Sequence, residues 1–319
     1  MLEILSVTTP IYVLIGVGFL TTRWGLFNRD DMRVFGRFVL NIALPAMLFR
    51  TVSQRSIGEI LNPTYLLAYL AGTFVVIFAG FFWSRRVVGL NRSSSTVCAM
   101  GMACSNSGYV GYPILLLILA QIAGVALALN LIVENLVVIP SLLLMLEPRQ
   151  DGAGRWEVVA KSLLRVAGNP LIIALFCGVA MSLLGWRLPT PLERSVDMVS
   201  ATTSGIALFV IGGMLVGLSL RGTGSRVASV AIGKLIAHPL AVFAAMATLP
   251  LFGMAPVASD LYMAGVLMAA MPMMGVYPTL ALAYGEEGIA APALLATTIA
   301  SFFTLSAWLW LFKHTAILA

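Results

Sequence analysis

Long apolar runs follow one another along nearly the whole chain, separated by short polar stretches. Most runs contain about 20 residues, the length that a helix needs to cross a ~30 Å hydrocarbon core. The pattern therefore predicts an all-α polytopic membrane protein with about ten transmembrane helices. The predicted spans cover residues 4–22, 34–52, 64–83, 96–119, 122–146, 169–185, 197–219, 227–251, 261–284 and 289–312.

Composition agrees with a lipid environment, since 60% of the residues are hydrophobic, 10% are charged and the mean hydropathy is +0.98. The formal net charge is +6. Because the arginines cluster at the ends of apolar runs, we expect them to meet lipid headgroups and expect no nucleic acid partner.

The cysteines Cys98, Cys104 and Cys177 lie within apolar runs and lack any metal-ligand spacing, so we expect free, buried thiols, no metal site and no cofactor.

Basic residues are distributed unevenly between alternate loops. If the N-terminus is outside, the inner loops hold thirteen Lys and Arg residues and the outer side holds five. The positive-inside rule then predicts that both termini lie outside. The first run begins with Glu3 rather than a basic segment, and we interpret it as a retained helix rather than a cleaved signal. The outer basic residues are Arg50, Arg55, Arg187, Arg194 and Lys313.

Short sequence matches suggest two repeats of five spans each, at residues 1–146 and 169–319, joined by a cytoplasmic connector at 147–168. With five spans in each half, the second half would insert upside down relative to the first. The matches occur in the same order in both halves, at offsets of 160, 164 and 165 residues. They pair Pro10–Gly18 with Pro170–Gly178, Asn41–Leu44 with Gly205–Leu208, and Gly111–Pro113 with Val276–Pro278.

The stretch "NSGYVGYP" (106–113) places helix-breaking residues inside the fourth predicted span, and "MPMMGVYP" (271–278) does the same in the ninth. Proline has no N–H and leaves the carbonyl four residues earlier unpaired. Such a defect in lipid must be satisfied by protein or by a water-filled cavity. A matched pair of broken helices predicts a transporter binding site, where helix ends would attract an anion. The prolines expected to break these helices are Pro113, Pro272 and Pro278.

A few polar residues interrupt the other apolar spans. Glu134 lies near the middle of its span, next to Asn135, so it faces a cavity, is protonated or has a partner. Either proton coupling or a structural hydrogen-bonding role would explain it. Lys234 and His238 are four residues apart and share a helix face, although Lys234 would also suit snorkelling towards the interface. Asn41 lies four residues before Pro45, which frees the Asn41 carbonyl.

At these residues the chain resembles the auxin efflux carrier family, which includes plant PIN auxin carriers and bacterial malonate and malate transporters. The resemblance covers essentially the whole chain, although the large cytoplasmic loop of the long plant carriers is missing. The segments that carry it are "RWGLF" (23–27), "FVLNIALPAMLF" (38–49), "NSGYVGYPILL" (106–116), "NPLIIAL" (169–175), "IGGMLVGLSL" (211–220), "KLIAHP" (234–239) and "MPMMGVYP" (271–278).

The resemblance implies a fold like that of the sodium/bile-acid symporters and NhaA-type antiporters, in which spans four and nine cross at their unwound centres. It also implies a scaffold of spans 1, 2, 6 and 7, a transport domain of spans 3–5 and 8–10, elevator-type alternating access, a homodimer and a bacterial inner membrane location. The crossover would be marked by Asn106, Pro113, Pro272 and Pro278. Neither crossing span contains Asp or Glu, which argues against sodium/proton exchange.

The function expected is secondary transport of a small organic anion such as malonate, malate or an auxin-like acid, with H⁺ or Na⁺ as the coupling ion. A sodium-coupled symporter of the bile-acid type and a passive anion channel are the alternatives. No enzyme motif is present, so we expect no enzymatic activity. Glu134, Lys234 and His238 are the expected coupling residues. The expected substrate-binding residues are Asn106, Ser107, Gly108, Tyr112, Pro113, Met274, Gly275, Val276, Tyr277, Pro278, Asn41 and Asn135.

Overall fold

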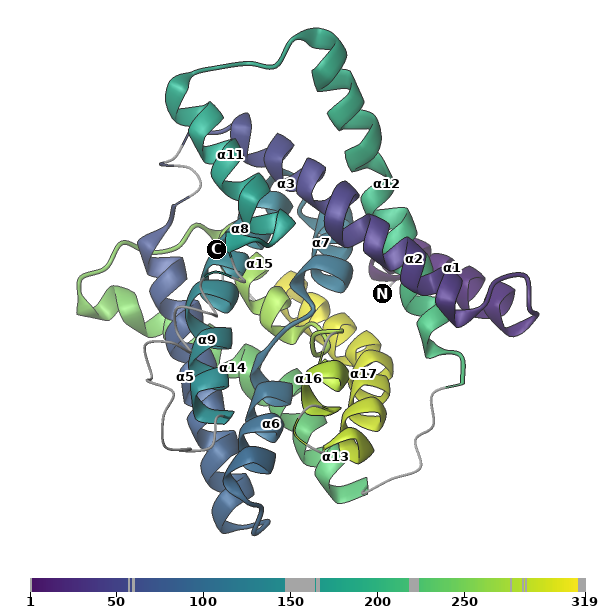
Figure 1. Ribbon diagram of the computed structural model, residues 1–319. Helices are drawn as coiled ribbons and strands as arrows, with labels where there is room; N and C mark the ends of the chain where they lie inside the picture. Colours follow the sequence, from purple (N-terminus) through teal and green to yellow (C-terminus); the bar gives the residue numbers. More distant parts are fainter. Residues whose placement is uncertain are drawn as a thin grey trace. The chain divides into compact units, whose positions relative to one another are not determined.

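The computed structural model describes residues 2–56, 58, 61–146, 164, 167–217, 224–275, 277–282, 284 and 286–314. Within these residues the chain is built of helices and contains no named β-strand, which confirms the predicted all-helical class (Figure 1). In the same part of the chain, six helices are long and apolar enough to cross a membrane. They are Arg29–Ser53, Pro63–Arg86, Ala120–Leu146, Thr190–Leu215, Gly224–Phe252 and Ile289–Phe312.

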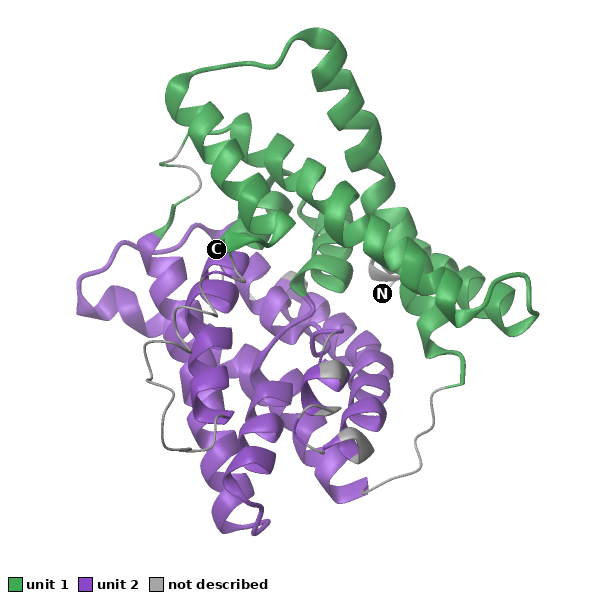
Figure 2. Ribbon diagram, in the orientation of Figure 1, with its two compact units in different colours: residues 1–62, 107–129, 167–218 green, residues 63–106, 130–166, 219–319 purple. Residues whose placement is uncertain are grey.

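The chain divides into two compact units, coloured separately in Figure 2. Unit 1 consists of Met1–Asn62, Ser107–Leu129 and Ala167–Leu218. In this unit α1 packs along α12, and α3 packs against α11. Its helices are α1 (Leu2–Arg23), α2 (Arg29–Phe38), η1 (Val39–Ala43), α3 (Leu44–Ser53), η2 (Ser107–Gly111), α7 (Tyr112–Ile118), the larger part of α8 (Ala120–Val133), α11 (Pro170–Leu184) and α12 (Thr190–Leu215).

Glycines allow α1 and α12 to approach each other closely within unit 1. A Cβ added at Gly212 would lie 1.9 Å from the Ile15 carbonyl oxygen, and one added at Gly18 would lie 2.0 Å from the Phe209 carbonyl oxygen. No side chain fits at either position. Small residues at helix contacts are typical of membrane proteins, where close backbone packing replaces the hydrophobic driving force.

Unit 2 consists of Pro63–Asn106, Asn130–Val166 and Ser219–Ala319. Here α5 packs against α6 and α14, and α13 packs against α17. Its helices are α5 (Pro63–Arg86), α6 (Arg92–Ala103), η3 (Glu134–Val138), α9 (Ile139–Leu146), α13 (Gly224–Ile232), η4 (Gly233–Ala237), α14 (His238–Thr248), η5 (Leu249–Phe252), α15 (Ser259–Ala270), α16 (Tyr277–Leu282) and α17 (Glu287–His314).

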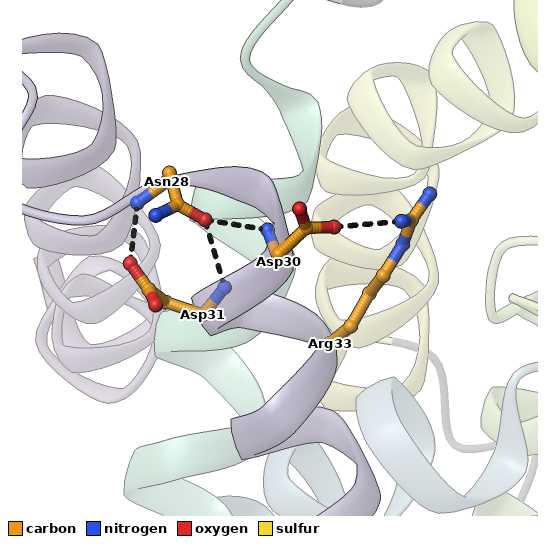
Figure 3. Close-up of polar contacts among 4 residues, drawn as sticks. All are labelled: Asn28, Asp30, Asp31 and Arg33. Carbon is orange, nitrogen blue, oxygen red and sulfur yellow. Dashed lines mark hydrogen bonds and ion pairs between the residues drawn. The ribbon is translucent and has the colours of Figure 1, made fainter.

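The start of α2 illustrates how local sequence sets a helix boundary (Figure 3). The Asn28 side chain accepts hydrogen bonds from the N–H groups of Asp30 and Asp31, at 2.8 and 3.0 Å. The Asp31 carboxylate accepts in return from the Asn28 N–H at 2.8 Å, which completes a capping box. Asp30 also pairs with the exposed Arg33 at 2.7 Å. The cap therefore satisfies the first free N–H groups of α2 and fixes where the helix begins.

Prolines leave a regular mark on the backbone. In the described chain the π-helical segments η1, η2, η3 and η4 each end two residues before a proline: Pro45, Pro113, Pro140 and Pro239. The residue next to the proline reaches back five positions instead of four, as in the bond from the His238 N–H to the Gly233 carbonyl. Since a proline removes the usual bond to the carbonyl four residues back, the π turn absorbs this defect without opening the helix.

The two units can be related to the predicted spans. Unit 1 includes the segments of the predicted spans 1, 2, 6 and 7, together with residues 107–129 of the predicted spans 4 and 5. The connector at 147–168 lies almost entirely outside the described residues. One cysteine expectation was wrong: Cys98 and Cys104 are buried, but Cys177 is exposed because it lies on an outward face of α11.

Candidate functional site

In unit 2 the extended segments that follow α6 and α15 pair with each other. Helix α6 ends at Ala103 and α15 ends at Ala270, and extended backbone follows each. Ser105 and Met273 form an isolated antiparallel β-bridge. The Asn106 N–H donates to the Pro272 carbonyl at 2.8 Å, and the Met274 N–H donates to the Cys104 carbonyl at 3.2 Å. Backbone groups that leave the two helices thus satisfy one another, as an apolar environment requires.

We call residues 104–106 and 271–275 the paired segments. The Asn106 side chain lies beside Gly275, since a Cβ added at that glycine would be 3.7 Å from Asn106 Nδ2. Gly275 is exposed and Asn106 is partly exposed, so one end of the paired segments is accessible. Met274 is buried, and Pro272 lies within the second segment. A side-chain amide carries two hydrogen-bond donors and one acceptor.

A buried lysine joins the first paired segment to the last turn of α15. Lys234 has an exposed fraction of 0%. Its Nζ donates to Ser105 Oγ at 2.8 Å, to the Ala269 carbonyl at 2.7 Å and bonds His238 Nδ1 at 2.9 Å. An ammonium carries three donors, and all of them have partners here. A buried charge is tolerated only when it is paired and hydrogen-bonded, so this site is built to hold a cation.

The hydrogen bonds around His238 fix the direction of donation. Thr73 Oγ1 donates to the Tyr69 carbonyl at 2.6 Å, so it must accept from His238 Nε2 at 3.0 Å. The ring proton therefore lies on Nε2, and Nδ1 is left to accept from Lys234. In this arrangement His238 is neutral and accepts a hydrogen bond from Lys234. Protonating His238 would remove the acceptor of Lys234 and place two cations side by side.

Glu134 lies in the same cluster. Its Oε1 accepts from the Ser105 N–H at 3.3 Å, and the carboxylate interacts electrostatically with Lys234. Tyr65, four residues before Tyr69, donates its hydroxyl to Asn130 Oδ1 at 2.7 Å. The structure therefore brings together the three expected coupling residues, Glu134, Lys234 and His238, next to the paired segments. We call them, with Tyr65, Tyr69, Thr73, Ser105 and Asn130, the buried polar cluster.

Sequence reasoning missed the members of this cluster that come from α5 and from the first paired segment. One signal was available, because Tyr65, Tyr69 and Thr73 are spaced four residues apart and so share one face of α5. The same spacing separates Asn130 from Glu134, and Lys234 from His238. Ser105 gives no such signal, since it lies outside any helix.

Several expected residues are satisfied away from the cluster. Asn41 Nδ2 donates to the Arg37 carbonyl at 2.8 Å, and Asn135 Nδ2 to the Leu131 carbonyl at 3.0 Å, each along its own helix. Within the described chain, the buried Tyr277 hydroxyl has no hydrogen-bond partner. The remaining expected residues fall into three groups: Ser107, Gly108, Tyr112 and Pro113 belong to unit 1, Pro278 lies in the first turn of α16, and Val276 lies outside the described residues.

Metal binding finds no support in the residues that the structure describes. Among them, no three His, Cys, Asp or Glu side chains lie close enough together to hold a metal ion. Separately, Lys234 donates to the carbonyl of Ala269 near the C-terminal end of α15. Helix C-termini carry partial negative charge, which a neighbouring ammonium stabilises.

Comparison with known proteins extends these observations. A family model described as "Membrane transport protein" matches residues 4–309. The "Putative malonate transporter" of Rhizobium meliloti is 28% identical over 99% of this chain and 98% of its own length. The "Uncharacterized transporter YfdV" of Escherichia coli K12 is 26% identical over 64% of this chain and 66% of its own. "Auxin efflux carrier component 8" of Arabidopsis thaliana is 22% identical over 66% of this chain and 71% of its own.

Proposed function

We propose a transport mechanism from one premise: the chain belongs to the membrane transport protein family, the auxin efflux carriers, and is an integral membrane protein. The family is one of membrane transporters rather than enzymes. On this basis the protein is a secondary active carrier of a small organic anion. A relative named for malonate over nearly the full length of both chains supports a carboxylate as the substrate.

One observation carries the proposal most directly: a fully buried ammonium holds two interrupted helices together beside an accessible amide. Helix interruptions deep in an apolar protein are unfavourable, and transporters use them to build substrate sites. The Asn106 amide would bind and orient the carboxylate, with Gly275 leaving room beside it. Ser107, Gly108, Tyr112, Pro113, Tyr277 and Pro278 remain substrate-site proposals on sequence grounds.

The charges of the cluster suggest how an anion and a proton are coupled. The ammonium of Lys234 is balanced by the carboxylate of Glu134 and by the C-terminal ends of α6 and α15. With Glu134 ionised, the cluster has no positive charge to spare for a substrate anion. When Glu134 takes up a proton, the ammonium is only partly balanced and the anion is attracted. The proton and the anion therefore bind together.

Lys234 also bears on the choice of coupling ion. The Ser105 hydroxyl and the Ala269 carbonyl, which are oxygen ligands of the kind that a sodium ion prefers, already accept from the ammonium. This favours H⁺ over Na⁺. A sodium-coupled symporter or a passive anion channel remains the alternative to be tested.

The remaining architecture is proposed from the sequence. Ten spans form two inverted repeats of five, with spans four and nine broken where they cross, and the carrier works as an elevator-type homodimer in a bacterial inner membrane. Both termini lie outside.

A labelling experiment tests this orientation. A cysteine introduced at Gln150, in a variant without the native cysteines, should resist impermeant thiol reagents added to intact cells. Ready labelling would mean that the connector lies outside and that the orientation is the reverse of the one proposed.

Counterflow of labelled malonate into proteoliposomes tests the proposed function. A carrier exchanges internal unlabelled substrate for external label and saturates, whereas a channel does neither. The Asn106→Ala variant should bind malonate about tenfold more weakly, because one or two hydrogen bonds to a charged group are lost. Asn135→Ala is the matched control, since its amide bonds along its own helix. Wild-type affinity in Asn106→Ala would remove this residue from the site.

A further inference from the structure

Unit 1 contains a cavity of about 480 Å³ at the junction of α3, α11 and α12. Sites for small molecules occupy about 300–1,000 Å³, so this cavity is large enough for one. All of its lining residues belong to unit 1, and none of them is a residue proposed above for the transported substrate. The cavity is therefore a candidate for a second ligand site, distinct from the proposed substrate site.

The lining is rich in arginine. Three arginines, Arg50, Arg55 and Arg187, and two acidic residues, Glu193 and Asp197, line the cavity. Arg50 Nε lies 2.6 Å from Asp197 Oδ1, so these two charges balance each other. Glu193 lies in the first turn of α12, where the helix dipole already stabilises a carboxylate. The cavity is thus left with an excess of positive charge.

The two other arginines differ in their surroundings. The Arg55 guanidinium donates to the Gln121 carbonyl, and its own backbone carbonyl accepts from the Ser182 hydroxyl. Both contacts hold Arg55 in place. Arg187 forms no hydrogen bond or ion pair with any other described residue. Arg187 is exposed, so its guanidinium is accessible to a ligand.

A helix cap fixes the backbone next to Arg187. Gly185 ends α11 in the left-handed conformation, with φ 63°, and its N–H donates to the Ser182 carbonyl at 3.2 Å. The Trp186 N–H reaches back to the Met181 carbonyl at 3.1 Å, which completes a Schellman motif. Trp186 is 64% exposed and lines the cavity directly before Arg187. The capped turn therefore presents an exposed aromatic ring and an exposed guanidinium in consecutive residues.

The position of these arginines in the sequence adds a second argument. In the predicted orientation only five basic residues lie on the outer side, and three of them, Arg50, Arg55 and Arg187, line this one cavity. Basic residues are disfavoured in outer loops, so their convergence calls for a local cause. An anionic ligand would supply it.

We infer that this cavity is a second anion site, which takes a carboxylate or phosphate group attached to an apolar body. The planar guanidinium fork suits both oxyanions, and the Trp186 ring offers the apolar body a surface. Two sources share this chemistry: a soluble organic acid and the headgroup of an anionic lipid. The inference does not depend on the proposed substrate site.

Binding to the purified protein in nanodiscs tests the inference, with thermal stability as the readout. One arm titrates benzoate into phosphatidylcholine nanodiscs, and the other raises the phosphatidylglycerol fraction without benzoate. Whichever of the two, benzoate or phosphatidylglycerol, stabilises the wild-type protein, Arg187→Gln should weaken its binding about tenfold, because one charge-assisted contact is lost. Arg194→Gln is the matched control, since this exposed arginine lies near the start of α12 but does not line the cavity.

An Arg187 effect in the benzoate arm identifies a soluble acid, and an effect confined to the phosphatidylglycerol arm identifies a lipid. Binding that is unchanged by Arg187→Gln in both arms would overturn the inference, as would equal weakening by Arg187→Gln and Arg194→Gln. The Asn106→Ala variant, measured in parallel, separates this site from the proposed substrate site. If it retains the Arg187-dependent binding, the cavity is independent of the substrate site, and if it abolishes that binding, the inference fails.

Discussion

The charged and titratable side chains discussed above are buried in unit 2 and exposed in unit 1. Unit 2 buries Lys234, His238 and Glu134, with exposed fractions of 0%, 0% and 7%. In unit 1 the paired side chains of Arg50 and Asp197 are 44% and 39% exposed, at the edge of an open cavity. Burying an ion pair often stabilises a protein less than apolar residues of the same size would. A need for stability therefore does not account for the buried polar cluster, whereas a role in transport does. The exposed charges of unit 1 are accessible to a ligand from the solvent.

Removing the lysine of the cluster should have the largest effect on stability. Lys234→Met leaves Glu134 without its cation and leaves Ser105 and Ala269 without their donor. Breaking one side of a buried pair typically costs about 3–5 kcal/mol. We expect a loss of this size in the free energy of unfolding of the purified protein, measured by denaturant titration in detergent.

A double variant provides the control for that prediction. Adding Glu134→Gln to Lys234→Met removes both charges, so part of the lost stability should return. If the double variant is as unstable as the sum of the two single ones, the two charges do not interact and the cluster has been described incorrectly.

In unit 1, a substitution at the contact between α1 and α12 should lower stability more than the loss of an exposed ion pair. Gly212→Ala places a Cβ against the Ile15 carbonyl of α1, and overpacking of this kind costs about 1–3 kcal/mol. The matched control is Gly205→Ala on the same helix, where no atom lies within 4 Å of the added Cβ. This control should be neutral or slightly stabilising, because alanine favours a helix. Equal thermal stability of the two variants would contradict the close packing of α1 and α12.

The smallest effect is expected at the ion pair of unit 1. Arg50→Met removes the partner of Asp197, but a half-exposed pair contributes at most about 1 kcal/mol. High salt should reduce the difference from the wild type further, because ions screen exposed charges. A loss as large as that of Lys234→Met would remove the distinction between the two units.

The sequence predicted the all-helical class because the apolar runs leave the chain few alternatives in lipid. It also located the polar residues of unit 2, since Glu134, Lys234 and His238 are conspicuous within apolar spans. The form of the helix defects was not predictable. Pro113 indicated a lost hydrogen bond, but the local sequence does not determine whether a π turn absorbs the defect or the helix opens.

Other parts of the site depend on contacts that spacing does not reveal. Ser105 bonds Lys234, which lies 129 residues away in the chain, so its role depends on how the helices of unit 2 pack. Asn41 and Asn135 were expected to bind substrate, but each can satisfy its amide on a carbonyl one turn earlier in its own helix. For a polar residue in an apolar span, a hydrogen bond within its own helix is therefore an alternative to ligand binding.

The central claim is that Glu134 carries the proton that accompanies the anion, and uptake of labelled malonate by proteoliposomes under an imposed pH gradient tests it most directly. Wild-type protein should concentrate malonate when the outside is acidic, and the gain should vanish when a protonophore removes the gradient. Glu134→Gln keeps hydrogen-bonding capacity but cannot titrate, so it should lose concentrative uptake while still exchanging malonate by counterflow. Concentrative uptake by Glu134→Gln at the wild-type level, with normal exchange, would contradict the account.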